Sequence, residues 1–163
     1  MVAHWQEFAA EAPDLCERGR RRLESTGLCL MGTLRRDGSP RISPVEPLII
    51  EGDLYLGMIW QSLKARDLER DPRCVVHSTV SDKSGQEGDF KLYGRAAPVA
   101  DKDERRRYCR ALESLTGWAP DGDQWHLFRL DIDQAAWFEV VPPDGHHVEV
   151  WRPGTEPEAR ERP

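Results

Sequence analysis

The sequence has no apolar run long enough to span a membrane, which takes roughly 18 residues. Its longest apolar stretches, residues 28–34 and 45–50, have the length of single strands. The first residues also lack a basic segment followed by an apolar one, so no secretory signal is expected. These absences predict a cytoplasmic protein with no membrane partner.

Cysteine is scarce, and its spacing lacks the close pairs of a metal site. Cys16, Cys29, Cys74 and Cys109 are far apart in the chain and form no Cys-x-x-Cys motif. Free thiols in a reducing compartment are the simplest interpretation. The adjacent histidines at 146–147 are more typical of a solvated turn than of a metal site. We therefore expect no metal.

Familiar catalytic motifs are missing as well. The sequence contains no glycine-rich nucleotide loop, no Gly-x-Ser-x-Gly elbow and no His-Glu-x-x-His helix. The net charge of −6 and the isoelectric point near 5.4 argue against nucleic acid as the main partner. A local basic pocket for a small anion remains compatible with this charge.

What is present predicts one mainly β domain. A chain of 163 residues with 39% hydrophobic residues is long enough to bury a core. Helical spacing predicts a two-part helical segment over residues 4–26 and short helices over 63–70 and 101–115. Strand patterns cover residues 28–34, 41–50, 54–59, 74–80, 89–99, 126–141 and 148–151.

The six or seven strands follow one another through short turns such as Asp37-Gly38, so they are expected to be antiparallel. That arrangement predicts a small, nearly closed barrel of Greek-key type with a few flanking helices. The domain is expected to occupy residues 1–152. Residues 153–163, rich in proline and charge, are expected to be a flexible tail.

The main functional signal lies in residues 32–73. Arg41 lies on a basic strand, and the chain then leads through a turn to a helix that begins after Ser62 and carries Lys64. A helix N-terminus offers unpaired N–H groups and partial positive charge, so a phosphate could bind there. Alternatively, Ser62 is only a cap, and the basic residues pair with nearby carboxylates at 67, 69 and 71. Spacing alone favours this second interpretation.

The order Thr-Leu-Arg-x-Asp-Gly-x-Pro-Arg, then two strands, then Ser-x-Lys-Ala-x-x-Leu-x-x-Asp-Pro-Arg resembles the pyridoxamine 5'-phosphate oxidase-like superfamily. The resemblance covers about residues 27–97. It implies a flavin-binding split β-barrel, a homodimer with its cofactor between the subunits. FMN is the first expectation, the deazaflavin F-420 the alternative, and haem a less favoured third.

The resemblance also implies which residues bind the cofactor. Arg41, Ser62 and Lys64 would contact its phosphate. Five residues would lie along its ring, namely Ile42, Ser43, Pro44, Met58 and Ile59. The chain departs from the family pattern at Glu46, where the oxidase proper has a lysine, and at Leu63, where an arginine is common. Both departures weaken a phosphate site.

Three further residues have two interpretations each. Trp60 directly precedes the phosphate helix and could stack on a cofactor or substrate ring, or it could be a core or interface anchor. His77 and Ser78 end a strand and could bind ring carbonyls, or they could form a buried, satisfied pair.

The sequence therefore predicts an FMN- or F-420-dependent oxidoreductase for a small conjugated substrate. No side chain is assigned as a catalytic acid or base, since the cofactor would carry the chemistry. Residues 145–152 resemble the substrate-binding end of the true oxidase only superficially, so a vitamin B6 enzyme is not expected. The alternatives are a non-catalytic cofactor- or haem-binding protein and a cofactor-free dimer.

Overall fold

The computed structural model describes residues 2–143 and 145–162. Along the chain the elements are α1 (Trp5–Glu11), α2 (Pro13–Glu24), β1 (Cys29–Leu34), β2 (Pro40–Val45), β3 (Pro47–Ile50), β4 (Asp53–Ile59), α3 (Leu63–Arg70), β5 (Arg73–Ser78), β6 (Asp89–Pro98), α4 (Lys102–Thr116), β7 (Trp125–Val141), β8 (Gly145–Trp151) and β9 (Glu158–Arg162). Within these residues, no helix has the length and apolar character needed to cross a membrane.

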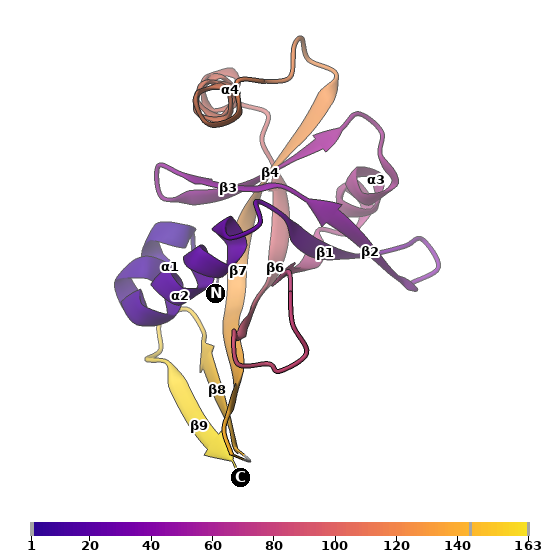
Figure 1. The fold of residues 1–163 in the computed structure, drawn as a ribbon. Coiled ribbons are helices and arrows are strands. Elements are labelled where there is room, and N and C mark those ends of the chain that lie inside the picture. Colours follow the sequence, from indigo (N-terminus) through magenta and orange to yellow (C-terminus); the bar gives the residue numbers. More distant parts are fainter. Residues whose placement is uncertain (1, 144, 163) are drawn as a thin grey trace.

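The strands form one antiparallel sheet in the order β2-β1-β5-β6-β7-β4-β3, and β8 and β9 extend it from the far end of β7. The two end strands of the main path, β2 and β3, are consecutive in the chain and are joined through Glu46 alone. The sheet therefore curls until its ends meet without pairing (Figure 1). The predicted split β-barrel, mainly β with short flanking helices, is confirmed.

One local irregularity interrupts the pairing of the long strands β6 and β7. The register between β6 and β7 shifts after Tyr93, where Gly94 pairs with Ile132 and Asp133 has no partner on β6, so β7 carries a bulge at this point. A Cβ at Gly94 would lie 2.1 Å from the carbonyl oxygen of Asp131. Only glycine lets the two backbones approach this closely.

The expected number of strands was too low, for two reasons. Residues 41–50 were predicted as one strand, but the strand breaks at Glu46 into β2 and β3. Residues 153–163 were expected to fray, yet residues 158–162 form β9 on the edge of β8. Glu11 anchors the turn that leads there, because its carboxylate accepts hydrogen bonds from Trp151 Nε1 (3.2 Å) and Gly154 N (2.8 Å).

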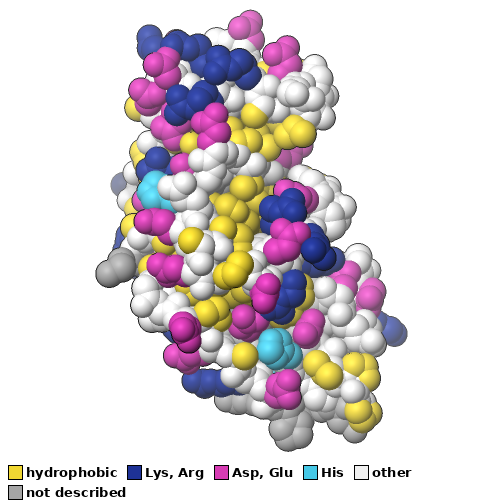
Figure 2. Space-filling view, turned by 90° about the vertical axis from the view of Figure 1, so that its left-hand side faces the viewer, with side chains coloured by type: hydrophobic (Ala, Val, Ile, Leu, Met, Phe, Trp, Pro, Cys, Tyr) yellow, Lys and Arg dark blue, Asp and Glu magenta, His cyan; other side chains and the backbone are white. Residues whose placement is uncertain are grey.

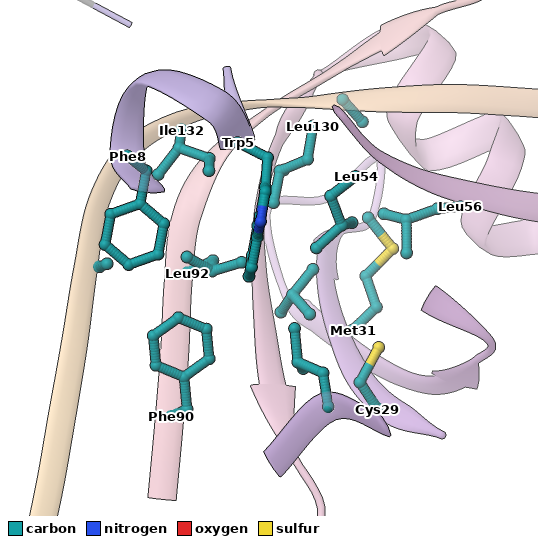
Figure 3. Packing of buried hydrophobic residues seen from close by; sticks show 14 of the residues in the cluster. Trp5, Phe8, Cys29, Met31, Leu54, Leu56, Phe90, Leu92, Leu130 and Ile132 are labelled. Atoms are coloured by element: carbon teal, nitrogen blue, oxygen red, sulfur yellow. The ribbon is translucent and has the colours of Figure 1, made fainter. Parts of the chain in front are cut away.

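The N-terminal helices belong to the main core. Phe8 is fully buried and packs on Trp5, Phe90 and Trp151, with ring centroids 5.5, 6.1 and 4.7 Å away. Figure 3 shows Phe8 and Trp5 entering the barrel beside Leu92 and Ile132. The predicted helical segment over 4–26 therefore closes one side of the barrel.

Helix α4 covers a second, smaller cluster on the other side of β4. Tyr108 and Leu112 pack there with Tyr55, Trp125 and Leu127. Leu115 lies at helical spacing from Tyr108 and Leu112, which predicts a buried side chain, but it is 70% exposed. Figure 2 shows acidic and basic side chains mixed over this end of the molecule, with hydrophobic side chains below them.

Replacing Phe8 by alanine tests the closure of the barrel by α1. We expect Phe8→Ala to lower the free energy of unfolding by about 4 kcal/mol, because it empties a site walled by three aromatic rings. Leu115→Ala is the control, since the exposed leucine should change stability by less than about 0.5 kcal/mol. Denaturant unfolding measures both, and equal midpoints for the two variants would show that α1 is not part of the core.

Candidate functional site

The two halves of the predicted phosphate site meet where β2 packs against α3. Arg41 Nε donates to Asp67 Oδ2 at 2.6 Å, and Lys64 Nζ donates to the carbonyl oxygen of Pro44 at 3.3 Å. Both contacts join the same strand to the same helix. The fold thus brings Arg41, Ser62 and Lys64 to one junction, although they are up to 23 positions apart in the sequence.

Asp67 organises this junction. Its side chain is 5% exposed and accepts hydrogen bonds from Thr33 Oγ1 (2.9 Å), Arg41 Nε and Arg70 Nη2 (3.1 Å). Burial raises the pKa of this carboxyl, but the hydrogen bonds from Arg41, Arg70 and Thr33 outweigh burial and hold it below the ordinary 3.8. In the folded protein the ionised carboxylate of Asp67 therefore holds Thr33 of β1 and Arg41 of β2 against α3.

The pairing of Arg41 with a carboxylate was the competing interpretation from sequence. It is present, but it uses only Nε, and in the described part of the chain the terminal nitrogens of Arg41 have no hydrogen-bond partner. An arginine anchored in this way loses little side-chain entropy when its outer nitrogens bind an oxyanion. Pairing and ligand binding are thus compatible.

Ser62 precedes α3 as its N-cap, but its side chain makes no capping hydrogen bond, so the expected side-chain cap is wrong. Its Oγ is inaccessible to solvent and has no hydrogen-bond partner among the described residues. A buried hydroxyl without a partner costs free energy. An oxygen of a bound phosphate at the start of α3 would satisfy it, so the residues at this junction fit a phosphate-bearing cofactor.

Two edges of the described strands are unpaired along the split in the barrel. Strand β2 pairs only with β1 within the described chain, and β3 covers β4 only as far as Leu56. These edges therefore carry backbone groups outside the ladder that a ligand can reach, although the carbonyl oxygens of Pro44 and Ile59 already accept Lys64 Nζ and the Ser62 N–H.

The side chains that the resemblance placed along the ring differ in exposure. Ile42 and Ile59 are 71% and 79% exposed, and Pro44 is also exposed. Ser43 is half-buried, while Met58 is buried in the core. Ile59 can therefore offer its side chain to a ligand, whereas Met58 can offer little beyond its backbone.

Trp60 stacks on His126, with ring centroids 4.6 Å apart and planes 12° apart. His126 Nε2 accepts the backbone N–H of Gln61 at 3.1 Å, so the proton of its neutral ring lies on Nδ1, 3.4 Å from Glu69 Oε1. Gln61 has a positive φ of 56°. His126 thus braces the turn before α3 and covers one face of Trp60.

The sequence analysis did not single out His126, which looked like one polar residue in an apolar strand. Its partners are more than 50 positions away in the chain. The only signal was the unusual placement of a histidine among buried strand residues.

His77 and Ser78 lie apart from this junction and point to opposite faces of β5. Ser78 is fully buried, and its Oγ accepts the N–H of Phe90 at 3.0 Å, so the interpretation as a satisfied core residue describes it. His77 is half-buried on the outer face, where the register places it beside Leu30, which in turn lies beside Pro44.

An antiparallel barrel that stays open between β2 and β3 defines the class of split β-barrel folds. The family model for pyridoxamine 5'-phosphate oxidase matches residues 16–142. The chain therefore belongs to the pyridoxamine 5'-phosphate oxidase family. No curated protein matches it.

Solved structures share this fold at low sequence identity. PhzG from Burkholderia lata 383, in complex with tetrahydrophenazine-1-carboxylic acid, has a TM-score of 0.65 and 13% identity over 93% of this chain and 92% of its own. A heme binding protein from Mycobacterium smegmatis has a TM-score of 0.62 and 16% identity over 83% and 57%. General Stress Protein 26 from Bacillus anthracis has a TM-score of 0.59 and 19% identity over 83% and 96%.

The ion pairs of Asp67 with Arg41 and Arg70 predict how stability depends on pH. Asp67→Asn should lower the free energy of unfolding by about 2 kcal/mol at neutral pH, because two arginines lose a charged partner. A carboxyl whose pKa is lowered by folding stabilises the protein above its unfolded-state pKa, near 3.8. The gap between parent and variant should therefore be constant at neutral pH and shrink as the parent's carboxyl protonates in acid.

Glu158→Gln is the control, because Glu158 pairs with Arg160 where both side chains are largely exposed. It should have a much smaller effect at every pH. Urea titrations at several pH values measure both variants. A gap for Asp67→Asn that is the same in acid as at neutral pH would contradict the role of the charge.

Proposed function

We propose that the protein is a flavin- or deazaflavin-dependent oxidoreductase that acts on a small conjugated organic molecule. The observation that carries the proposal is the junction of β2 and α3, where Arg41 has free terminal nitrogens and Ser62 has a buried hydroxyl without a partner. FMN and F-420 both carry a phosphate for this junction. FMN remains the first candidate.

Each part of the site has a task in this proposal. When bound, the cofactor supplies hydride chemistry. Arg41, Lys64 and Ser62 bind its phosphate, and the free edges of β2 and β4 orient its ring. The apolar side chains of Ile42 and Ile59 keep water from the ring faces. No residue of the chain is assigned as an acid or base.

The two departures from the family pattern, Leu63 and Glu46, affect the phosphate junction differently. Leu63 is 58% exposed at the first position of α3, so the junction lacks one cation that an arginine would add. Glu46 makes no ion pair within the described chain and lines a cleft with Tyr108. It does not pair with Arg41, whose Nε is bound to Asp67.

Non-catalytic binding of a cofactor or haem is the second candidate, favoured by Leu63, which leaves the junction one cation short, and by the fold shared with a heme binding protein. The absorption spectrum of the purified protein separates flavin, deazaflavin and haem. Reduction and reoxidation of the bound cofactor in the presence of candidate substrates then separates turnover from storage.

We also propose a cytoplasmic homodimer formed through the outer face of β2, β1, β5 and β6. The register places Gly32 between Ile42 and Val75, and Val75 beside Tyr93, which gives one continuous patch. Ile42 is 71% exposed and Tyr93 40% exposed. Contiguous apolar surface of this kind at an unpaired sheet edge marks an association surface. Four cysteines without disulfides fit a reducing compartment.

The phosphate junction predicts distinct effects of two substitutions. Lys64→Ala should raise the dissociation constant for FMN by about tenfold to a hundredfold, because a charge-assisted contact is lost. Ser62→Ala should weaken FMN binding by about fivefold without lowering the stability of the cofactor-free protein, since its hydroxyl has no partner there. Fluorescence quenching of FMN measures the affinities.

Lys102→Ala is the control for charge, because Lys102 is exposed on α4 and away from the junction. Its affinity for FMN should equal that of the parent. If all three variants bind FMN like the parent, the phosphate does not bind at the junction of β2 and α3.

The proposed interface predicts a change of oligomeric state. Ile42→Glu places a charge in the centre of the apolar patch and should convert the dimer into a monomer at micromolar concentration. Leu115→Glu is the control, because Leu115 is equally exposed but lies on α4, away from the patch. Sedimentation velocity measures both, and a parent that is already monomeric would refute the dimer.

A further inference from the structure

A cleft opens between the end of β4 and helix α4, on the side of the split away from α3. Its volume is about 160 Å³. The walls are mostly apolar and aromatic, with Tyr108, Trp118 and Trp125 on the α4 side and Ile59 on the β4 side. Among the described residues that line it, Glu46 alone is charged.

The carboxylate of Glu46 is free to bind a ligand. Glu46 is the single residue between β2 and β3, and within residues 2–143 and 145–162 it forms no hydrogen bond or ion pair. Arg41, the nearest cation in the sequence, is bound to Asp67. An unpaired carboxylate at an aromatic cleft attracts cations and repels phosphates and carboxylates.

Tyr108 supplies a second polar atom. Its side chain is buried, and a Cβ at position 57 would lie 2.5 Å from its Oη, so glycine at 57 makes room for the hydroxyl beside β4. Burial, and then the charge of Glu46, raises the pKa of Tyr108 to about 12. The phenol therefore stays uncharged, and its hydroxyl has no hydrogen-bond partner in the described chain.

The aromatic walls suit a cation. Trp125 stacks with Tyr108 at 5.7 Å and already carries the guanidinium of Arg105 over its ring at 3.8 Å. Trp118 is 63% exposed and offers another ring to a ligand. Indole and phenol faces attract ammonium groups through their quadrupoles.

We propose that this cleft binds an organic ammonium ion with one ring-sized apolar body, with its nitrogen at the Glu46 carboxylate and the body against Trp118 and Tyr108. The size follows from the volume, since an apolar cavity of about 150 Å³ holds one benzene ring. Met58 and Ile59 line this cleft and also lie on the open edge of β4, where the cofactor ring is proposed to bind, so the cation is the recognised end of a substrate. The role of the cation as part of a substrate rests on the proposed function, whereas binding of the cation does not.

The test compares three ligands that differ in charge: benzylammonium, benzyl alcohol and benzoate. Calorimetry and tryptophan fluorescence of the full chain measure their affinities, with and without FMN. Benzylammonium should bind about tenfold more tightly than benzyl alcohol, and benzoate most weakly. Glu46→Gln should remove the preference for the cation while leaving the affinity for benzyl alcohol unchanged.

Glu113→Gln is the matched control, because it removes the same charge from the surface of α4 outside the cleft. It should keep the parent's preference. Trp118→Ala should weaken all three ligands together, since it removes a wall of the cleft rather than its charge. Equal affinities for the cation and the alcohol in the parent, or a preference that survives Glu46→Gln, would overturn the inference.

The two proposals fail in different ways. If FMN does not bind but benzylammonium binds in a Glu46-dependent manner, the cleft is a cation site and the proposed oxidoreductase is wrong. If FMN binds at the junction of β2 and α3 but benzylammonium does not bind, the cation site is wrong and the oxidoreductase stands.

Discussion

The curl of one antiparallel sheet is the constraint on which the sites depend. Its end strands, β2 and β3, are consecutive in the chain and are separated only by Glu46. A one-residue link is too short for a hairpin turn, so the two strands cannot pair with each other and the barrel stays open at that point. The open edges of β2 and β4 are the direct result, and both candidate binding sites lie along them.

Buried charge then fixes the chemistry of each side of this opening. On the α3 side, Asp67 neutralises Arg41 and Arg70 only in part and holds Arg41 with its outer nitrogens free. On the α4 side, Glu46 has no cation of its own among the described residues and faces aromatic rings. One side therefore suits an anion and the other a cation, within the width of a few strands. A cofactor and a substrate of opposite charge could occupy them together without competing.

Much of this fold follows from local sequence patterns. The two helices in residues 4–26 and the turn at Asp37-Gly38 depend on residues close together in the chain, and both are present. The strand β9 could not be predicted in the same way, because its residues are polar and it is held by backbone pairing to β8 and by an anchor at Glu11. Leu115 shows the same limit, since helical spacing cannot tell which side of α4 meets another element.

The sequence by itself determined the family, the barrel and the set of residues from which the phosphate junction is built, because these depend on ordered motifs and on alternation along single strands. Only the tertiary structure decided how those residues are used. It showed that Arg41 is both paired and available, that Ser62 does not cap its helix, and that His126 supports the turn before α3. Each of these depends on contacts between segments far apart in the chain, and burial, not local spacing, sets their energies.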